Sequence, residues 1–187
     1  MKLNLFSVPI WIGNIDASKI KIENQETNIS FGSEINTTKK VNGTNTIDGE
    51  SLTYVYQKFI EQLDKSFHTP YTLQLVDIWE NFYNEVDFQE NHIHAGSDLS
   101  FIIYKKIDEA RTVFVNPQNN ILEAFYHESN LKSKYFGPQY FAPDCRTNQF
   151  IIFPSHIEHF VKKTKNAITI AGNMILQFTN DSQRKGK

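Results

Sequence analysis

The second half of the chain is a succession of short apolar runs, a pattern compatible with few folds. From residue 71 to 178 these runs are rich in β-branched and aromatic residues, and Asp, Asn, Pro and Gly separate them. The runs cover residues 72–83, 99–105, 112–115, 121–126, 149–153 and 167–178. Short strands at such spacing, with turn signals between them, indicate an antiparallel sandwich or jelly roll. We therefore predict a mainly β fold with a jelly-roll core over residues 71–178.

The first half of the chain has a different pattern. Residues 14–50 are polar, rich in Asn, Thr, Ser, Gly and Lys, and we predict a largely irregular segment there. From Ser51 onward apolar residues recur at steps of three or four, which predicts a helix with one buried face and Ser51 as its N-cap. We place this helix over residues 51–69, because Pro70 follows. At 187 residues the chain is long enough for one well-buried core, so we expect a single domain, 1–187.

Composition argues against several classes of protein. The formal net charge is −2, so the basic character of a nucleic-acid binder is missing and we expect no nucleic-acid partner. No segment approaches the roughly 20 apolar residues of a membrane span. A single cysteine, Cys145, excludes an internal disulfide and argues against a cysteine-based zinc site. Because the N-terminus lacks an apolar core followed by a small-residue cleavage site, we expect a cytoplasmic protein.

Two histidines lie two positions apart just before an apolar run. Residues i and i+2 of a strand share one face, so we expect His92 and His94 to direct their imidazole nitrogens at one point. A later segment, residues 150–161, adds His159 near the end of a second hydrophobic run. Three imidazoles suit a first-row metal, and jelly rolls hold metals in the barrel mouth. The alternative is a solvent-facing pair and a half-buried His159 that binds a backbone carbonyl.

Several motifs occur together in an order that resembles a known family. They are Leu5-Phe-Ser-Val-Pro-Ile10, Trp79-Glu-Asn81, His92-Ile-His94, Leu99-Ser-Phe-Ile-Ile-Tyr104, Val113-Phe-Val-Asn-Pro117 and Phe153-Pro-Ser-His-Ile-Glu-His159-Phe-Val161. The chain resembles the small 2-oxoglutarate/Fe(II)-dependent oxygenases encoded by phages and bacteria. The resemblance implies a double-stranded β-helix, Fe(II) held by His92, His94 and His159, and 2-oxoglutarate as cosubstrate. For a phage-encoded chain it implies the host cytoplasm.

The resemblance also implies residues that bind the cosubstrate. Such oxygenases place an arginine, with a serine two residues later, on the strand after the last histidine, where it pairs with the distal carboxylate of 2-oxoglutarate. The corresponding stretch here begins with Ala167 and keeps a hydroxyl at Thr169, but the arginine is missing. We therefore expect Lys105 or Lys165 to supply the positive charge, with Tyr104 and Thr169 as hydrogen-bonding partners. The other outcomes are a different small acid or a loss of activity.

The remaining site residues belong to the substrate pocket, where we place Trp79 and Asn81, although a strand tryptophan is more often a core residue. Three classes of function stay open. The first is an Fe(II)/2-oxoglutarate-dependent dioxygenase, a hydroxylase of unknown substrate. The second is a cupin-like metalloenzyme that uses the same histidines without 2-oxoglutarate. The third is a non-enzymatic jelly-roll module that binds a partner. Metal content separates the third class from the others, and turnover of the cosubstrate separates the first two.

Overall fold

The computed structural model describes residues 8–23, 27–29, 35–40, 42–85, 87–108, 112–118, 138–162 and 166–179. The first part of the chain contains β1 (Trp11–Asn14), the 3-10 helix η1 (Ala17–Lys19), β2 (Ile22–Glu23), β3 (Asn28–Ile29), β4 (Asn36–Thr37), β5 (Thr46–Ile47) and α1 (Gly49–Leu63). The second part contains β6 (Tyr71–Tyr83), β7 (Gln89–His92), β8 (Leu99–Lys106), β9 (Thr112–Val115), β10 (Tyr140–Phe141), β11 (Gln149–Pro154), β12 (His159–Val161) and β13 (Ala167–Phe178). No helix within these ranges is long and apolar enough to cross a membrane.

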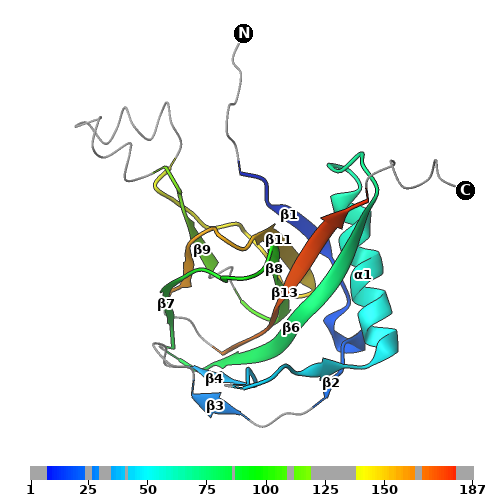
Figure 1. The fold of residues 1–187 in the computed structure, drawn as a ribbon. Coiled ribbons are helices and arrows are strands. Elements are labelled where there is room, and N and C mark those ends of the chain that lie inside the picture. Colours follow the sequence, from blue (N-terminus) through cyan, green and yellow to red (C-terminus); the bar gives the residue numbers. More distant parts are fainter. Residues whose placement is uncertain are drawn as a thin grey trace, which may run out of the picture.

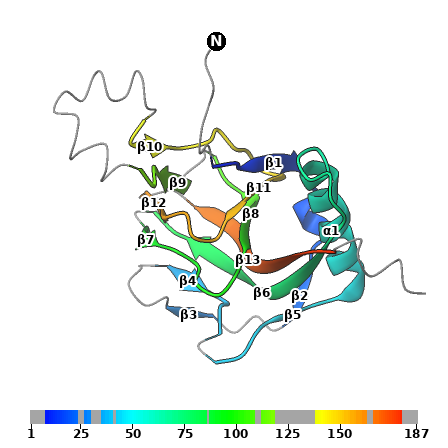
Figure 2. The ribbon, with the colours of Figure 1, turned by 45° about the horizontal axis from the view of Figure 1, so that its top comes forward.

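Most of the described strands belong to two antiparallel sheets (Figure 1). The larger sheet has the strand order β1-β11-β8-β13-β6-β4-β3, and the smaller sheet has the order β10-β9-β12-β7. The smaller sheet lies over one face of the larger sheet, and α1 lies on its other side (Figure 2). The predicted mainly β jelly roll with one flanking helix is therefore confirmed.

The predicted strands agree closely with the observed ones. Five of the six are present with ends shifted by at most one residue, and they are β6, β8, β9, β11 and β13. The sixth, residues 121–126, lies outside the described residues. The described part of the polar segment 14–50 contains η1 and the two-residue strands β2 to β5. Its hydroxyl groups join it to the larger sheet, because Thr37 Oγ1 donates to Glu80 O at 3.1 Å and Glu80 N donates to Thr38 Oγ1 at 2.8 Å.

Helix α1 differs from its prediction at both ends. It begins at Gly49 with Asp48 as N-cap, not at Ser51, because the Asp48 carboxylate accepts hydrogen bonds from the backbone N–H groups of Glu50 and Ser51 at 3.1 and 3.0 Å. Helix α1 ends at Leu63 rather than at residue 69. A turn follows, in which Phe67 N donates to Leu63 O at 2.9 Å. The predicted helix was too long because Phe67 continues the helical spacing of apolar residues and still packs on the core after that turn.

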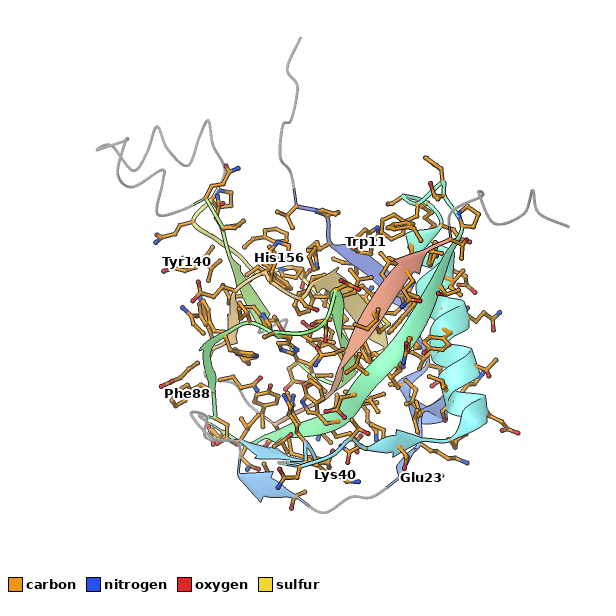
Figure 3. All side chains as sticks on the ribbon, in the orientation of Figure 1. Trp11, Glu23, Lys40, Phe88, Tyr140 and His156 are labelled. Atoms are coloured by element: carbon orange, nitrogen blue, oxygen red, sulfur yellow. The ribbon has the colours of Figure 1, made fainter. Side chains whose placement is uncertain are left out.

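The larger sheet separates two hydrophobic clusters, because neighbouring residues of a strand face opposite sides. In β8, Phe101 and Ile103 belong to the cluster beneath α1, where Phe101 meets Phe59 at 4.9 Å between ring centroids. Ile102 and Tyr104 belong to the cluster between the two sheets. Figure 3 shows how the side chains fill these layers, with Trp11 toward α1. Strand β8 therefore contributes every second residue to the space between the sheets.

Candidate metal centre

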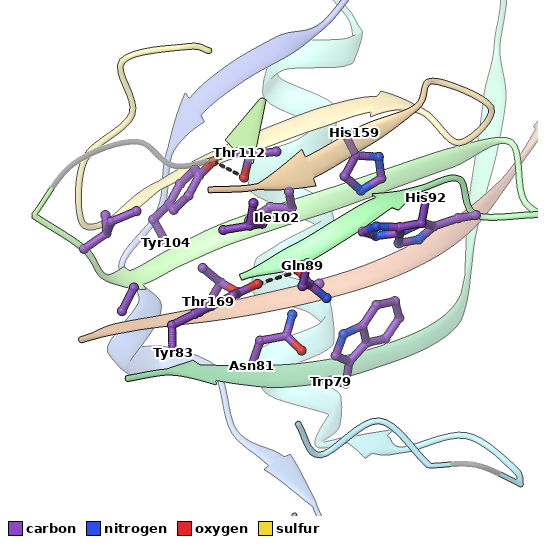
Figure 4. Close-up of a pocket in the computed structure, with 15 residues that line it drawn as sticks. Trp79, Asn81, Tyr83, Gln89, His92, Ile102, Tyr104, Thr112, His159 and Thr169 are labelled. Atoms are coloured by element: carbon purple, nitrogen blue, oxygen red, sulfur yellow. Dashed lines mark hydrogen bonds between the residues drawn. The ribbon is translucent and has the colours of Figure 1, made fainter. Parts of the chain in front are cut away.

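Three histidines converge at the edge of the space between the sheets (Figure 4). His92 ends β7 and His159 begins β12, and the two residues are direct partners in the antiparallel pairing of these strands. His94 lies just beyond β7, where its backbone N–H donates to Ser155 O at 3.0 Å. The ring centroids lie 4.3 Å apart for His92 and His159, 5.2 Å for His92 and His94, and 5.1 Å for His94 and His159. One ring nitrogen of each histidine lies within 4.8 Å of the other two, so the cluster could hold a metal ion.

Each of the three rings has its Nδ1 atom next to an oxygen acceptor. The acceptors are Glu90 O for His92 at 2.7 Å, Asn173 Oδ1 for His94 at 2.5 Å, and Ile157 O for His159 at 3.0 Å. A backbone or amide oxygen can only accept, so Nδ1–H donates in all three cases and the Nε2 atom keeps its lone pair. A hydrogen bond of this kind fixes the tautomer and orientation of a metal-binding histidine.

Burial keeps these imidazoles neutral. It lowers the pKa of His159 to about 3 and the pKa of His94 to about 4, and it lowers the pKa of His92 in the same direction. The proximity of His92 adds to the effect on His159. His159 is only 2% exposed. A neutral imidazole is the form that ligates a metal, so the cluster needs little proton release to bind one near pH 7.

A hydrogen-bond network supports His94 from the larger sheet. Asn173 Oδ1 accepts a second hydrogen bond from Ser100 Oγ at 2.8 Å, and Ser100 Oγ lies 2.8 Å from Ser155 Oγ. Ser100 and Ser155 are fully buried. No role was predicted for Asn173 from the sequence, although Asn173 lies in the same strand as Ala167 and Thr169. The network joins β13, β8 and the segment after β11 to a single imidazole.

A pocket extends from the histidines between the two sheets (Figure 4). The predicted substrate-pocket residues Trp79 and Asn81 line it, and so do Tyr104 and Thr169, which were predicted to bind the cosubstrate. Trp79 stacks on His94, with 5.8 Å between ring centroids and 28° between ring planes. Thr169 is the cross-strand partner of both Asn81 and Tyr104, so these three side chains form one row across β6, β13 and β8.

Sequence reasoning missed three further polar residues of the pocket: Tyr83, Gln89 and Thr112. Tyr83 Oη donates to Gln89 Oε1 at 2.6 Å, and Tyr104 Oη donates to Thr112 Oγ1 at 3.0 Å. Burial raises the pKa of both tyrosines well above the usual range, so both hydroxyl groups stay protonated. The alternation of β6 predicts Tyr83, because it lies two and four residues after Asn81 and Trp79.

Of the two lysines predicted to bind a cosubstrate, only Lys105 lies in the part of the chain that the structure describes, and it does not line the pocket. Lys105 follows Tyr104 in β8 and faces the opposite side of the sheet, where its Nζ pairs with Glu80 Oε1 at 2.7 Å. The prediction for Lys105 is corrected accordingly, because Tyr104 and Lys105 have opposite parity in the strand. Lys165 lies outside the described residues. Lys39, which the sequence did not suggest as a site residue, has its Nζ 4.3 Å from the centroid of the Trp79 ring.

Two antiparallel sheets around a polar pocket with three converging histidines define a jelly-roll protein with a candidate metal centre. A family model described as "Putative 2OG-Fe(II) oxygenase" matches residues 77–173, which include all three histidines and Asn173. The chain belongs to this family, whose members use Fe(II) and 2-oxoglutarate.

Solved structures show a similar fold. A 2OG-Fe(II) oxygenase family oxidoreductase from Burkholderia pseudomallei has a TM-score of 0.52 and 11% sequence identity, over 80% of this chain and 72% of that one. A prolyl-4-hydroxylase from Pseudomonas putida has a TM-score of 0.49 and 12% identity, over 83% of this chain and 78% of that one. The first of these likenesses supports the double-stranded β-helix. No curated protein matches the chain.

Proposed function

We propose that this protein is an Fe(II)-dependent dioxygenase, a hydroxylase that couples decarboxylation of a 2-oxo acid to oxidation of a second substrate. One observation carries the proposal: three neutral imidazoles, of which His159 is buried and the other two are half-buried, bring one ring nitrogen each within 4.8 Å of one another at the end of a polar pocket. Membership of the 2OG-Fe(II) oxygenase family supports it. In this proposal His92, His94 and His159 hold the iron.

The donor set fits the metal. Imidazole nitrogens suit first-row metals, and three protein ligands leave coordination positions for small molecules. When bound, the iron supplies the oxidising chemistry for a 2-oxo acid and O₂. The neutral state of all three histidines leaves the positive charge of Fe(II) uncompensated by protein ligands. The centre therefore favours anionic small-molecule ligands such as the head group of a 2-oxo acid.

The chain positions and shields this centre with its own residues. Phe153 meets His159 at 4.8 Å and Phe114 at 4.9 Å between ring centroids, which closes one side with aromatic surface. Trp79 covers His94 from another side. These rings border the histidine cluster with apolar surface on two sides. In the proposed enzyme, Trp79 and Asn81 face the substrate, and Thr169 and Tyr104 line the space for the 2-oxo acid.

The proposal is tested by iron binding and by cosubstrate consumption. Anaerobic calorimetry is expected to show one Fe(II) per chain for the wild type and strongly weakened binding for His92→Ala and His159→Ala. His156→Ala is the matched control, because His156 is exposed and lies outside the cluster. Equal Fe(II) binding by wild type and His92→Ala would refute the ligand assignment.

The second measurement is the O₂-dependent release of CO₂ from a panel of 2-oxo acids by the iron-loaded protein. Release that depends on iron and is lost in His159→Ala is the expected result. Tight iron binding without consumption of any 2-oxo acid would instead favour a cupin-like metalloenzyme of another reaction type.

A further inference from the structure

The part of the pocket beyond the histidines is polar but carries no charge. Apart from the histidines, its polar lining residues are Asn81, Tyr83, Gln89, Tyr104, Thr112 and Thr169. The other lining residues are apolar, and no Lys, Arg, Asp or Glu occurs among the described lining residues. Within the part of the chain that the structure describes, a group that enters this part of the pocket is therefore met by neutral side chains only.

The two lysines described nearby do not change this picture. Lys105 lies on the far face of the larger sheet and pairs with Glu80. Lys39 Nζ lies 4.3 Å from the centroid of the Trp79 ring, and Trp79 stacks on His94. Lys39 is thus placed at the metal end of the pocket and not at the inner end.

The inner end is formed around Ala167. Ala167 is 2% exposed, lines the pocket and is the cross-strand partner of Tyr83. On the same face of β13, Thr169 is the partner of Tyr104. The hydroxyl hydrogens of Tyr83 and Tyr104 already point to Gln89 and Thr112, so the tyrosines offer lone pairs rather than free donors to a ligand.

The inner end of the pocket is unfavourable for the second carboxylate of a dicarboxylic acid. A charge moved from water into a buried site is strongly unfavourable unless a counter-charge or several donors meet it. 2-Oxoglutarate carries a carboxylate at each end, and the iron neutralises only the one beside the oxo group. The described lining residues therefore offer the distal carboxylate hydrogen bonds but no counter-charge, so they suit an uncharged tail better.

We propose that the pocket selects a 2-oxo acid with an uncharged tail over 2-oxoglutarate. This inference rests on the proposed function, because it names the cosubstrate class of the same site. The reference compound is 2-oxopentanoate, which has the five-carbon length of 2-oxoglutarate and a methyl group in place of the distal carboxylate. The polar row of Asn81, Thr169 and Tyr104 also accommodates a neutral tail that forms hydrogen bonds.

The test measures binding separately from activity. The protein is loaded with Zn(II), which does not react with O₂, and each acid is titrated by calorimetry. Tighter binding of 2-oxopentanoate than of 2-oxoglutarate is expected, by about tenfold or more, because the distal carboxylate lacks a charged partner. With Fe(II), the same order of preference is expected in CO₂ release.

A substitution at the inner end reverses the preference. Ala167→Arg introduces a guanidinium on the pocket face of β13 and is expected to tighten 2-oxoglutarate binding about tenfold to a hundredfold. Ala167→Met is the matched control for side-chain size and is expected to give no such gain. Lys39→Met is expected to leave the ratio of the two affinities unchanged. If the Ala167 variants do not fold, the wild-type comparison still decides the question.

The possible outcomes separate this inference from the proposed function. Wild-type protein that binds 2-oxoglutarate at least as tightly as 2-oxopentanoate would overturn the inference and leave the proposed function intact. A 2-oxoglutarate preference that disappears in Lys39→Met would overturn it too and would identify Lys39 as the anchor. If the metal-loaded protein neither binds nor consumes either acid, both the inference and the proposed function are wrong.

Discussion

Replacing Asn173 with alanine removes the acceptor that fixes the His94 ring. Asn173 Oδ1 lies 2.5 Å from His94 Nδ1 and also accepts a hydrogen bond from Ser100 Oγ at 2.8 Å. Without this oxygen, the imidazole loses the bond that selects its Nδ1–H tautomer. Loss of such a partner typically weakens metal binding 10- to 100-fold, which corresponds to about 1.4–2.7 kcal/mol.

The structure explains why a partial loss is expected instead of a complete one. His94 keeps its backbone hydrogen bond to Ser155 and its stacking on Trp79, so the ring stays close to the other two. The Nδ1 acceptors of His92 and His159 are backbone oxygens, which the substitution leaves in place. The substitution therefore removes the Nδ1 acceptor of His94 only, and the rings of the other two histidines keep theirs.

The assay is a competition titration of Zn(II) or Fe(II) against a chromophoric chelator at pH 7. Asn173→Asp retains an acceptor and is expected to bind metal at least as tightly as the wild type. Ser100→Ala removes the other hydrogen-bond partner of Asn173 and is expected to change the affinity little. Wild-type affinity in Asn173→Ala, or an equal loss in Ser100→Ala, would refute the reasoning.

Three further results are expected. Burial lowers the pKa of His159 to about 3, so the unfolded chain, with a histidine pKa of about 6.5, takes up the proton first as pH falls. His159 alone should therefore cost the metal-free protein about 2 kcal/mol of stability between pH 7 and pH 5, and the lowered pKa values of His94 and His92 add to this loss. Urea unfolding at both pH values measures this loss, and His159→Gln should show a smaller one. Gly172→Ala should destabilise the protein by about 1–3 kcal/mol, because a Cβ there would lie 2.4 Å from Phe101 Cζ and 2.6 Å from the Asp77 carbonyl oxygen; unchanged thermal unfolding would contradict this. Phe59→Ala should cost about 3–5 kcal/mol in the same assay, because the ring is fully buried, and a cost below 1 kcal/mol would show that the cluster beneath α1 is loosely packed.

The sequence predicted those parts of the structure that depend on local periodicity. The strand bounds followed from alternation and turn residues, and His92 and His94 were placed together because they lie two positions apart. The pairing of His92 with His159 depends on the register between β7 and β12, and neither of these strands was among the predicted ones. The pairing of β8 with β13 is irregular beside Lys105, so the contact of its Nζ with Glu80, and not alternation alone, places Lys105 on the face opposite Tyr104.

Other features depend on contacts between residues that are distant in the sequence. Asn173 and His94 are 79 positions apart in the sequence, so no local sequence pattern could predict their contact. The N-cap of α1 was predicted at Ser51, but it is Asp48, whose carboxylate accepts hydrogen bonds from the backbone N–H groups of Glu50 and Ser51. The neutral inner end of the pocket could be recognised only from the structure, which shows which side chains of each strand face the space between the sheets.

The position of β7 at the edge of the smaller sheet links metal binding to the local opening of that strand. Among the described strands, β7 is paired on one side only, and its register with β12 shifts between His159 and Val161. A metal held by His92 and His159 joins the edge strand to its neighbour through a second, coordinate link beside the hydrogen bonds. Without the metal, only hydrogen bonds to β12 would hold the short edge strand β7 in place. Short edge strands of this kind open first and can pair with other chains. Amide hydrogen exchange in β7 should therefore accelerate when the metal is removed, while exchange in the centrally placed β13 should hardly change.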